Sequence, residues 1–227
     1  MLFIVKLLFG FIPNPYDLCV FNKTIDGHQC TICFHVDDLL IICGSDTVID
    51  SIVKDLGKTF AGVCVGAIHS YFGMDITIST IGVSVDMNGY FKKIIEKRTP
   101  TGRAATLPTT ENLLDHDDSA VLLNEAKQKL FHSGVAKVLF IAKRVRMMSL
   151  TAVCALASRG NLSTYLDREK LDRVFSYLAY GRDIVMKFKC GGTVDFEVHV
   201  DASWATHMDC HDRTGIVIMM SGCAIAA

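Results

Sequence analysis

The period of the apolar positions changes several times along the first half of the chain, and each change predicts a different element. Alternating runs broken by Asp26-Gly27 and Gly44-Ser45 predict strand, turn, strand, turn and strand over residues 20–46. A helix is predicted next, because apolar residues recur at helical spacing at Val48, Ile52, Val53 and Leu56. Two short alternating runs and a helix that begins near Asn88 follow. This order predicts an α+β fold with an antiparallel sheet.

The second half of the chain begins with a polar stretch and then returns to helices and strands. Residues 99–118 hold two of the four prolines together with threonine, glycine and aspartate, which predicts a linker. Helical patterns follow over residues 120–159 and in a segment that ends at Gly181. The apolar face of that last helix consists of Leu171, Val174, Phe175 and Leu178. Strands are predicted over residues 194–200 and 215–220.

Composition and charge limit the classes of protein that fit. Half of the 227 residues are hydrophobic, so the chain can bury one large core or two small ones. The net charge is −1, which excludes a basic field over the whole molecule, so any contact with nucleic acid must be local. The nine cysteines are odd in number and dispersed, which argues against a disulfide framework and indicates a reducing compartment.

The first 13 residues, MLFIVKLLFGFIP, are apolar apart from Lys6 and Pro13. This run is shorter than the roughly 20 residues that a bilayer span needs, so we expect no membrane partner. A signal peptide is the alternative interpretation, but the small-residue cleavage pattern is missing and Lys6 lies inside the run. We therefore expect a packed helix or strand here, in a chain that is intracellular and not secreted.

Two acids, Asp37 and Asp38, stand side by side in the most strand-like segment. Apolar runs on both sides would hold the pair at the tip of a tight hairpin. Two close carboxylates resist ionising together unless a cation compensates, and Mg²⁺ is the cation that carboxylates and phosphates share. The residues alone leave two interpretations open. One is a magnesium site for phosphoryl transfer, and the other is a purely structural turn.

The segment around these acids, FHVDDLLIICGSD, resembles the aromatic-x-Asp-Asp box of reverse transcriptases in copia-type retrotransposon Pol polyproteins. Downstream, AIHSYFGMDI resembles that family's Tyr-Leu-Gly hairpin, and NGYFKKIIEK resembles its next helix. FHSGVAKVLFIAKRVR and REKLDRVFSYL resemble the helices between polymerase and ribonuclease H. VHVDASWATHMDCHDRTGIVIMMSG resembles the opening strands of ribonuclease H. The likeness is collinear and covers nearly the whole chain.

The resemblance implies an α+β chain in consecutive parts. Residues 1–98 would be the C-terminal part of a reverse-transcriptase palm, with an antiparallel sheet and hairpin, and the start of the thumb. Residues 99–118 would be a linker, and residues 119–190 a helical thumb or connection. Residues 191–227 would be the truncated start of a ribonuclease H-like sheet.

The resemblance also implies roles for single residues. Asp37 and Asp38 match the acids that hold two Mg²⁺ ions, and Asp201 matches the first metal-ligating acid of ribonuclease H. The segment Tyr71, Phe72 and Gly73 matches the hairpin that steers the primer end. The implied partners are an RNA or DNA template-primer and deoxynucleotide triphosphates. Candidate phosphate contacts, for which a solvated helix face is the alternative, are Lys92, Lys93, Lys137, Lys143 and Arg144.

The chain departs from the family's pattern in ways that bear on activity. In the family a third acid lies well upstream of the box, whereas only 36 residues precede Asp37, and Asp17 and Asp26 match the stretch after that acid. Ribonuclease H needs further acids, and only 26 residues follow Asp201. His35 stands where the family more often has tyrosine. We therefore expect little or no polymerase activity from this chain alone, and the alternative is a non-catalytic remnant that binds nucleic acid or a partner.

Three further expectations follow from the sequence. CTIC at 30–33 lacks a second ligand pair, so buried thiols are the alternative to zinc there. HMDCH at 207–211 offers His207, Cys210 and His211 but has no fourth ligand nearby in sequence, so a turn without metal is the alternative. A palm that lacks strands would expose a sheet edge that favours self-association. The parent protein would act in a cytoplasmic particle or in the nucleus.

Overall fold

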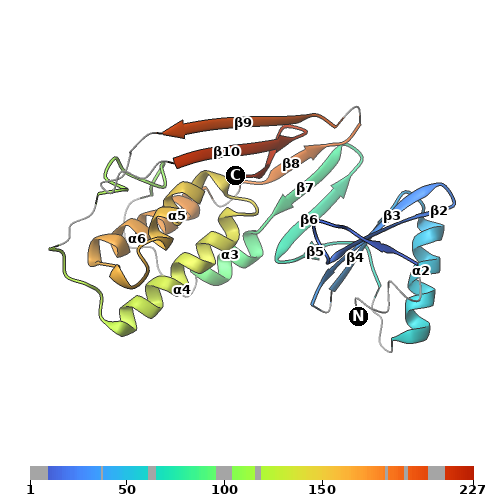
Figure 1. Ribbon diagram of the computed structural model, residues 1–227, viewed down its shortest axis with the longest axis horizontal. Helices are drawn as coiled ribbons and strands as arrows, with labels where there is room; N and C mark the ends of the chain where they lie inside the picture. Colours follow the sequence, from blue (N-terminus) through green and yellow to red (C-terminus); the bar gives the residue numbers. More distant parts are fainter. Residues whose placement is uncertain are drawn as a thin grey trace. The chain divides into compact units, whose positions relative to one another are not determined.

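The computed structural model describes residues 10–36, 38–60, 65–95, 104–115, 119–181, 184–191, 194–203 and 213–227 (Figure 1). The chain divides into two compact units, Met1–Phe72 and Gly73–Ala227. Both units combine helices with antiparallel strands. Among the helices that the structure describes, none has the length and apolarity that a bilayer crossing demands.

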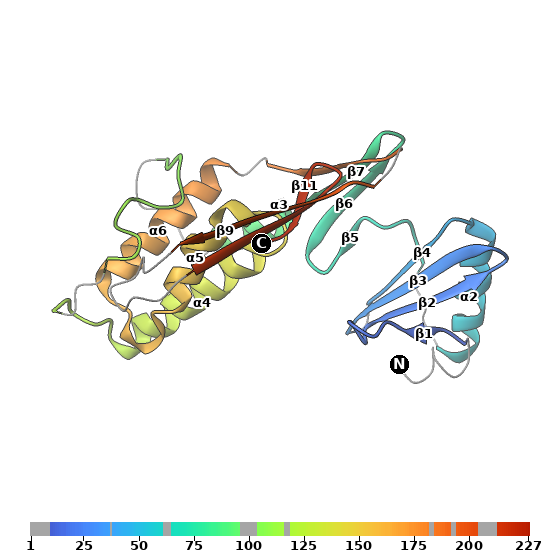
Figure 2. The same ribbon diagram turned by 45° about the horizontal axis from the view of Figure 1, so that its top comes forward.

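The first unit is built on an antiparallel sheet whose strands follow one another in chain order. These strands are β1 (Ile12–Pro13), β2 (Val20–Ile25), β3 (His28–His35) and β4 (Asp38–Cys43). Helix α2 (Asp46–Thr59) runs along one face of the sheet, as both ribbon views show (Figure 2). The short strand β5 (Ser70–Tyr71) comes at the end of this unit in the chain and belongs to a different sheet. Asp26 and Gly27 both adopt positive φ in the turn between β2 and β3, as expected for an Asp-Gly hairpin signal.

The core of the first unit explains why α2 covers only one face. Alternate residues of β3 point to the same side of the sheet, and on that side Cys30, Ile32 and Phe34 are buried. They pack against the predicted helical stripe, whose buried members are Val48, Ile52 and Leu56. The predictions of the three strands and of this helix are therefore confirmed.

The second unit contains two antiparallel sheets and most of the helices. One sheet pairs β6 (Met74–Ser79), β7 (Gly82–Asp86) and β8 (Met186–Lys189) in that order. The other has the order β11 (Cys223–Ala226), β10 (Arg213–Met220) and β9 (Phe196–Ser203). The helices are α3 (Asn88–Ile95), α4 (Glu125–Ala142), α5 (Leu150–Ala157) and α6 (Tyr165–Tyr180), with the 3₁₀ turns η1 (Met147–Ser149) and η2 (Gly160–Leu162).

Helices α4, α5 and α6 pack around a shared apolar core. The α6 positions predicted from helical spacing, Leu171, Val174, Phe175 and Leu178, are all buried there. Helix α6 ends at its C-cap Gly181, as predicted. Strand β8 was not predicted, because its four residues, MKFK, are too few to establish a period.

The predicted linker is packed against the helices over the part of it that the structure describes, residues 104–115. Ala105 is buried in the core that α4, α5 and α6 share. The ammonium group of Lys170 donates to the backbone oxygens of Leu113 at 3.1 Å and Asp115 at 2.9 Å. The division into compact units falls between Phe72 and Gly73, within residues 1–98, which the sequence assigns to one part.

Candidate functional site

The hairpin of β3 and β4 positions Asp38, the residue of the Asp37–Asp38 pair that the structure describes. His35 ends β3 and pairs with Asp38, the exposed first residue of β4, so only positions 36 and 37 connect the strands. Val36 has a φ of 54°, which a connection this tight requires and which a β-branched residue rarely adopts. Asp37 lies outside the described residues. Asp38 therefore lies at the end of the hairpin where the sequence predicts it.

Asp38 belongs to the face of the sheet that α2 does not cover. Cys30, Ile32 and Phe34 face α2, so the alternate residue His35 faces the other way, and Asp38 lies opposite His35. Here this surface is called the open face. It also carries Asn22, Thr31, Cys33, Leu40 and Ile42, as the strand register shows. Ile42 is 54% exposed on it.

Two residues that follow α2 in the chain, Tyr71 and Phe72, lie beside this end of the hairpin. The rings of His35 and Phe72 meet edge to face, with centroids 3.8 Å apart and planes at 73°. Tyr71 lies within electrostatic reach of Cys33 and Asp38, and burial, followed by these two groups, raises the pKa of its hydroxyl above the usual 10.0. The fold thus brings Tyr71 and Phe72 beside the Asp38 hairpin, although more than 30 residues separate them in the chain.

The donor chemistry of this end of the hairpin suits a hard divalent cation. Asp38 presents carboxylate oxygens at an exposed position, and Asp37 precedes it in the sequence. Mg²⁺ prefers such oxygens and commonly takes one or two carboxylates together with water and substrate phosphates. Over the described ranges, no three histidine, cysteine or acidic side chains gather into a metal-binding group. The magnesium expectation therefore depends on the pair Asp37 and Asp38.

The predicted phosphate contacts divide into two kinds. Lys92, Lys93, Lys137 and Lys143 have exposed side chains on α3, on α4 and at the C-cap of α4. Arg144 is half-buried: its guanidinium lies 3.7 Å from the ring centroid of Phe140 and donates to the Phe140 carbonyl at 3.0 Å. Burial lowers the pKa of the Arg144 guanidinium below its usual value. Arg144 thus has a packing role that the four lysines lack.

Asp201 lies on β9, where it pairs with Gly215 of β10 and is exposed. One of its carboxylate oxygens accepts a hydrogen bond from the backbone N–H of Ala202 at 3.0 Å. The neighbouring Trp204 and the HMDCH segment at 207–211 lie outside the described residues. The strands that carry Asp201 are those predicted from the sequence, with β9 reaching Ser203.

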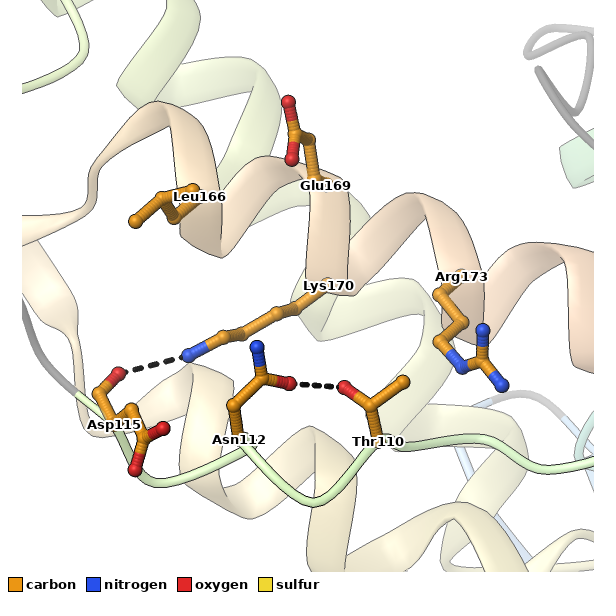
Figure 3. Close-up of a pocket in the computed structure, with 7 residues that line it drawn as sticks. All are labelled: Thr110, Asn112, Asp115, Leu166, Glu169, Lys170 and Arg173. Carbon is orange, nitrogen blue, oxygen red and sulfur yellow. Dashed lines mark hydrogen bonds between the residues drawn. The ribbon is translucent and has the colours of Figure 1, made fainter.

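A pocket of about 350 Å³ lies between the 104–115 segment and α6 (Figure 3). Its charged lining residues are Asp115, Glu169, Lys170 and Arg173, so positive and negative groups balance. Lys170 extends toward the backbone of residues 113–115, where it is already bonded. The pocket therefore offers neither a free acid pair nor a net charge, and the hairpin remains the candidate site.

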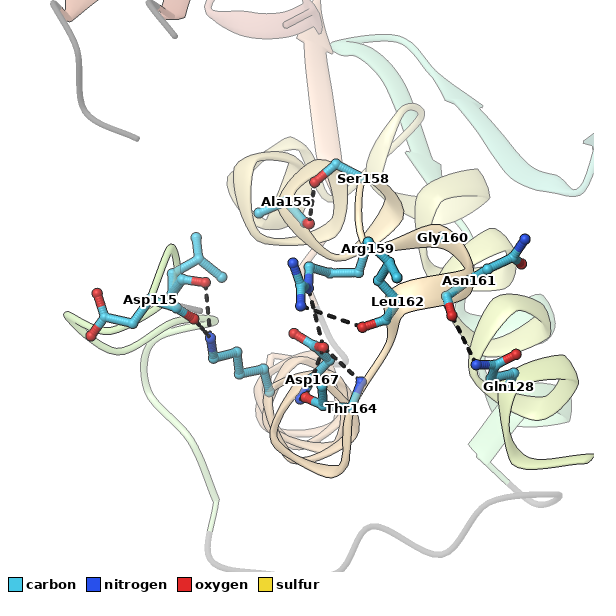
Figure 4. Close-up of polar contacts among 12 residues, drawn as sticks. Asp115, Gln128, Ala155, Ser158, Arg159, Gly160, Asn161, Leu162, Thr164 and Asp167 are labelled. Carbon is cyan, nitrogen blue, oxygen red and sulfur yellow. Dashed lines mark hydrogen bonds and ion pairs between the residues drawn. The ribbon is translucent and has the colours of Figure 1, made fainter. Parts of the chain in front are cut away.

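Sequence reasoning missed a buried ion pair that fixes the start of α6 (Figure 4). Asp167 is 3% exposed and accepts hydrogen bonds from the Thr164 N–H at 2.8 Å and the Thr164 hydroxyl at 2.9 Å. Arg159 donates to the same carboxylate oxygen at 3.2 Å. The available signal was the capping-box spacing of Thr164 and Asp167 ahead of an apolar helix. This network is structural, since it closes the turn between α5 and α6.

Comparison with known proteins gives one informative result. No protein-family model matches the sequence, and no solved structure matches the chain. The chain is similar to the putative transposon Ty5-1 protein of Saccharomyces cerevisiae, with 24% identity over 208 residues. The aligned region covers 90% of this chain and 67% of the yeast protein. This similarity supports a transposon-related origin for the chain.

Proposed function

We propose that this chain is part of a copia-type retrotransposon reverse transcriptase, an RNA-directed DNA polymerase, that runs into the start of a ribonuclease H. The observation that carries the proposal is the convergence of Tyr71 and Phe72 on the hairpin end that bears Asp38. These residues come from the segments that resemble the family's catalytic box and primer-end hairpin. The similarity to a transposon protein over 90% of the chain supports the same origin.

In the proposed site, Asp37 and Asp38 hold Mg²⁺, which supplies charge stabilisation for phosphoryl transfer when it is bound. The chain's own residues position the nucleic acid. The open face carries uncharged side chains, among them Asn22 and Thr31, whose side chains share a hydrogen bond of 2.8 Å. Uncharged side chains of this kind do not repel a phosphodiester backbone that approaches the acids. Tyr71 keeps its proton at neutral pH and can donate to a phosphate or sugar oxygen.

The exposed lysines of α3 and α4 supply sequence-independent contacts in this proposal. Lys92, Lys93, Lys137 and Lys143 extend into solvent, as phosphate-binding side chains must. They position a template-primer and do not read its bases. This suits a polymerase, which must accept every template sequence.

The metal part of the proposal is tested with Mn²⁺ as a paramagnetic substitute for Mg²⁺. In isotope-labelled protein we expect Mn²⁺ to broaden the amide signals of His35, Val36 and Leu39 first. Asp38→Asn should abolish this broadening. Asp26→Asn is the matched control, since Asp26 occupies the tight turn at the other end of β3 and should leave the broadening unchanged. Broadening that is absent, or that persists in Asp38→Asn, would refute the metal site.

A primed RNA template tests the polymerase part. Fluorescence anisotropy should show that the reduced chain binds the primed template, and that Mg²⁺ strengthens this binding in the wild type but not in Asp38→Asn. Binding that is equally strong in both proteins and indifferent to Mg²⁺ would instead identify a nucleic-acid-binding remnant without a catalytic site.

A further inference from the structure

Two cysteines lie directly opposite each other in the β3–β4 hairpin. The register pairs Cys30 with Cys43, and both belong to the face that α2 covers. Directly opposed residues of antiparallel strands have Cα atoms about 4.5 to 5.5 Å apart, which lies inside the 4.4 to 6.8 Å range of disulfides. Both thiols are free. The hairpin thus holds a pair of thiols at the separation that a cross-link requires.

The two thiols differ in their exposure to solvent. Cys30 is completely buried, whereas Cys43 is partly exposed at the end of β4. Burial, followed by a hydrogen bond with Cys43, raises the pKa of the Cys30 thiol to about 11. Cys30 also donates to the His28 carbonyl oxygen at 3.8 Å. A reagent from solvent therefore meets Cys43 first, and Cys30 is the thiol within reach of whatever forms there.

Cys33, the other cysteine of the CTIC segment, does not share this geometry. It lies on the open face, three residues from Cys30, and its partner across the hairpin is Leu40. The alternation of side chains along β3 places the two cysteines of this segment on opposite faces of the sheet. Cys33 therefore serves as a matched control within the same strand.

We propose that Cys43 and Cys30 are an oxidant-reactive pair, in which Cys43 is the modification site and Cys30 resolves it to a cross-strand disulfide. The Cys43 thiolate attacks a small-molecule disulfide such as glutathione disulfide, whose S–S bond breaks and releases one glutathione. Cys30 then attacks the Cys43 sulfur of the mixed disulfide and displaces the second glutathione, which takes the Cys30 proton. Two protein thiols are oxidised and one glutathione disulfide is reduced to two thiols. The resulting disulfide cross-links strands β3 and β4 of the hairpin that carries Asp38.

The test uses the full chain, fully reduced, freed of reductant and then incubated with glutathione disulfide. Free thiols are alkylated in denaturant with one reagent, and oxidised thiols are reduced and alkylated with a second. We expect peptide mass spectrometry of the unreduced protein to show Cys30 joined to Cys43. We also expect hydrogen exchange of the β3 and β4 amides to slow by about 100-fold, since closing a loop of this length stabilises by roughly 3 kcal/mol.

Two variants separate this pair from general thiol oxidation. Cys33→Ser should form the same cross-link at the same rate as the wild type. Cys43→Ser should leave the Cys30 thiol reduced, because the variant cannot form the mixed disulfide at position 43 that Cys30 attacks. The proposal is overturned if the wild-type chain keeps Cys30 reduced while Cys43 carries glutathione, or if the cross-link joins Cys33 or Cys19. The wild-type peptide map decides between these outcomes even if a variant fails to fold.

Discussion

The imidazole of His35 and the phenyl ring of Phe72 meet edge to face with their centroids 3.8 Å apart. Edge-to-face aromatic pairs contribute about 0.5 to 1.5 kcal/mol beyond the area they bury. We predict a coupling energy of this size between His35→Ala and Phe72→Ala. A double-mutant cycle on the hydrogen exchange of the β3 and β4 amides measures it. Strictly additive effects would show that the contact does not hold Phe72 at the hairpin.

Val36 should be replaceable with a gain in stability. Its φ of 54° lies in the left-handed region, which costs a β-branched residue about 1 to 2 kcal/mol, and its side chain is 78% exposed. We predict that Val36→Gly stabilises the hairpin by up to about 1 kcal/mol in urea denaturation. Ile42→Gly is the control, because Ile42 is an exposed strand residue of β4 whose loss should destabilise. A loss of stability in Val36→Gly would contradict the strained turn.

The free energy of unfolding should fall as the pH rises from 9 to 11. The Cys30 thiol has its pKa raised from 9.0 to about 11 by burial, so below pH 9 both the folded and unfolded chains hold this proton. Between pH 9 and 11 only the folded chain holds it, and stability is lost. We predict that Cys30→Ala removes roughly 1 to 3 kcal/mol of this fall, measured by denaturation in reductant. Cys154→Ala, at an exposed position, should keep the wild-type slope.

Asp167 should be among the most sensitive polar positions of the helical core. Replacing it with alanine leaves the Thr164 N–H without an acceptor and the mostly buried Arg159 without its ion partner. We predict a loss of about 3 kcal/mol for Asp167→Ala and a smaller loss for Asp167→Asn, which keeps an acceptor oxygen. Glu169→Ala, at an exposed position on the same helix, should change stability by less than about 0.5 kcal/mol. Equal effects of the two alanine variants in urea denaturation would refute the role of the network.

Lys143 and Arg144 are neighbours with different expected roles. We predict that Lys143→Ala lowers the slope of log K against log salt for template-primer binding by about 1, because it removes one phosphate contact, and leaves stability unchanged. Arg144→Ala should instead lower stability by about 1 to 2 kcal/mol, because it removes the stacking on Phe140 and the bond to the Phe140 carbonyl. An unchanged salt slope in Lys143→Ala would remove Lys143 from the interface.

Local patterns predicted those elements that bury one regular face. The apolar stripe of α2 and the four apolar positions of α6 could be predicted because a helix repeats its buried residues at a fixed period. The position of Asp38 at the end of a hairpin could be predicted because Asp37 and Asp38 stand between two apolar runs. Each of these predictions needed only neighbouring residues.

Contacts between distant segments were beyond the reach of such patterns. Nothing in the spacing of His35 and Phe72 shows that their rings meet, and the pairing of Cys30 with Cys43 depends on the exact hairpin register. The composition of residues 99–118 predicts a linker because proline and polar residues favour irregular backbone. It cannot show that Lys170, more than 50 residues downstream, anchors that backbone.

The docking of the 104–115 segment has a practical consequence for anyone who subclones the helices for expression. A gene fragment that starts at residue 119 would remove Ala105 from the helical core. It would also remove the carbonyl groups of Leu113 and Asp115, to which Lys170 donates. The purified product would expose fresh apolar surface and tend to precipitate. Cutting at Gly73 keeps this segment with the helices that it covers.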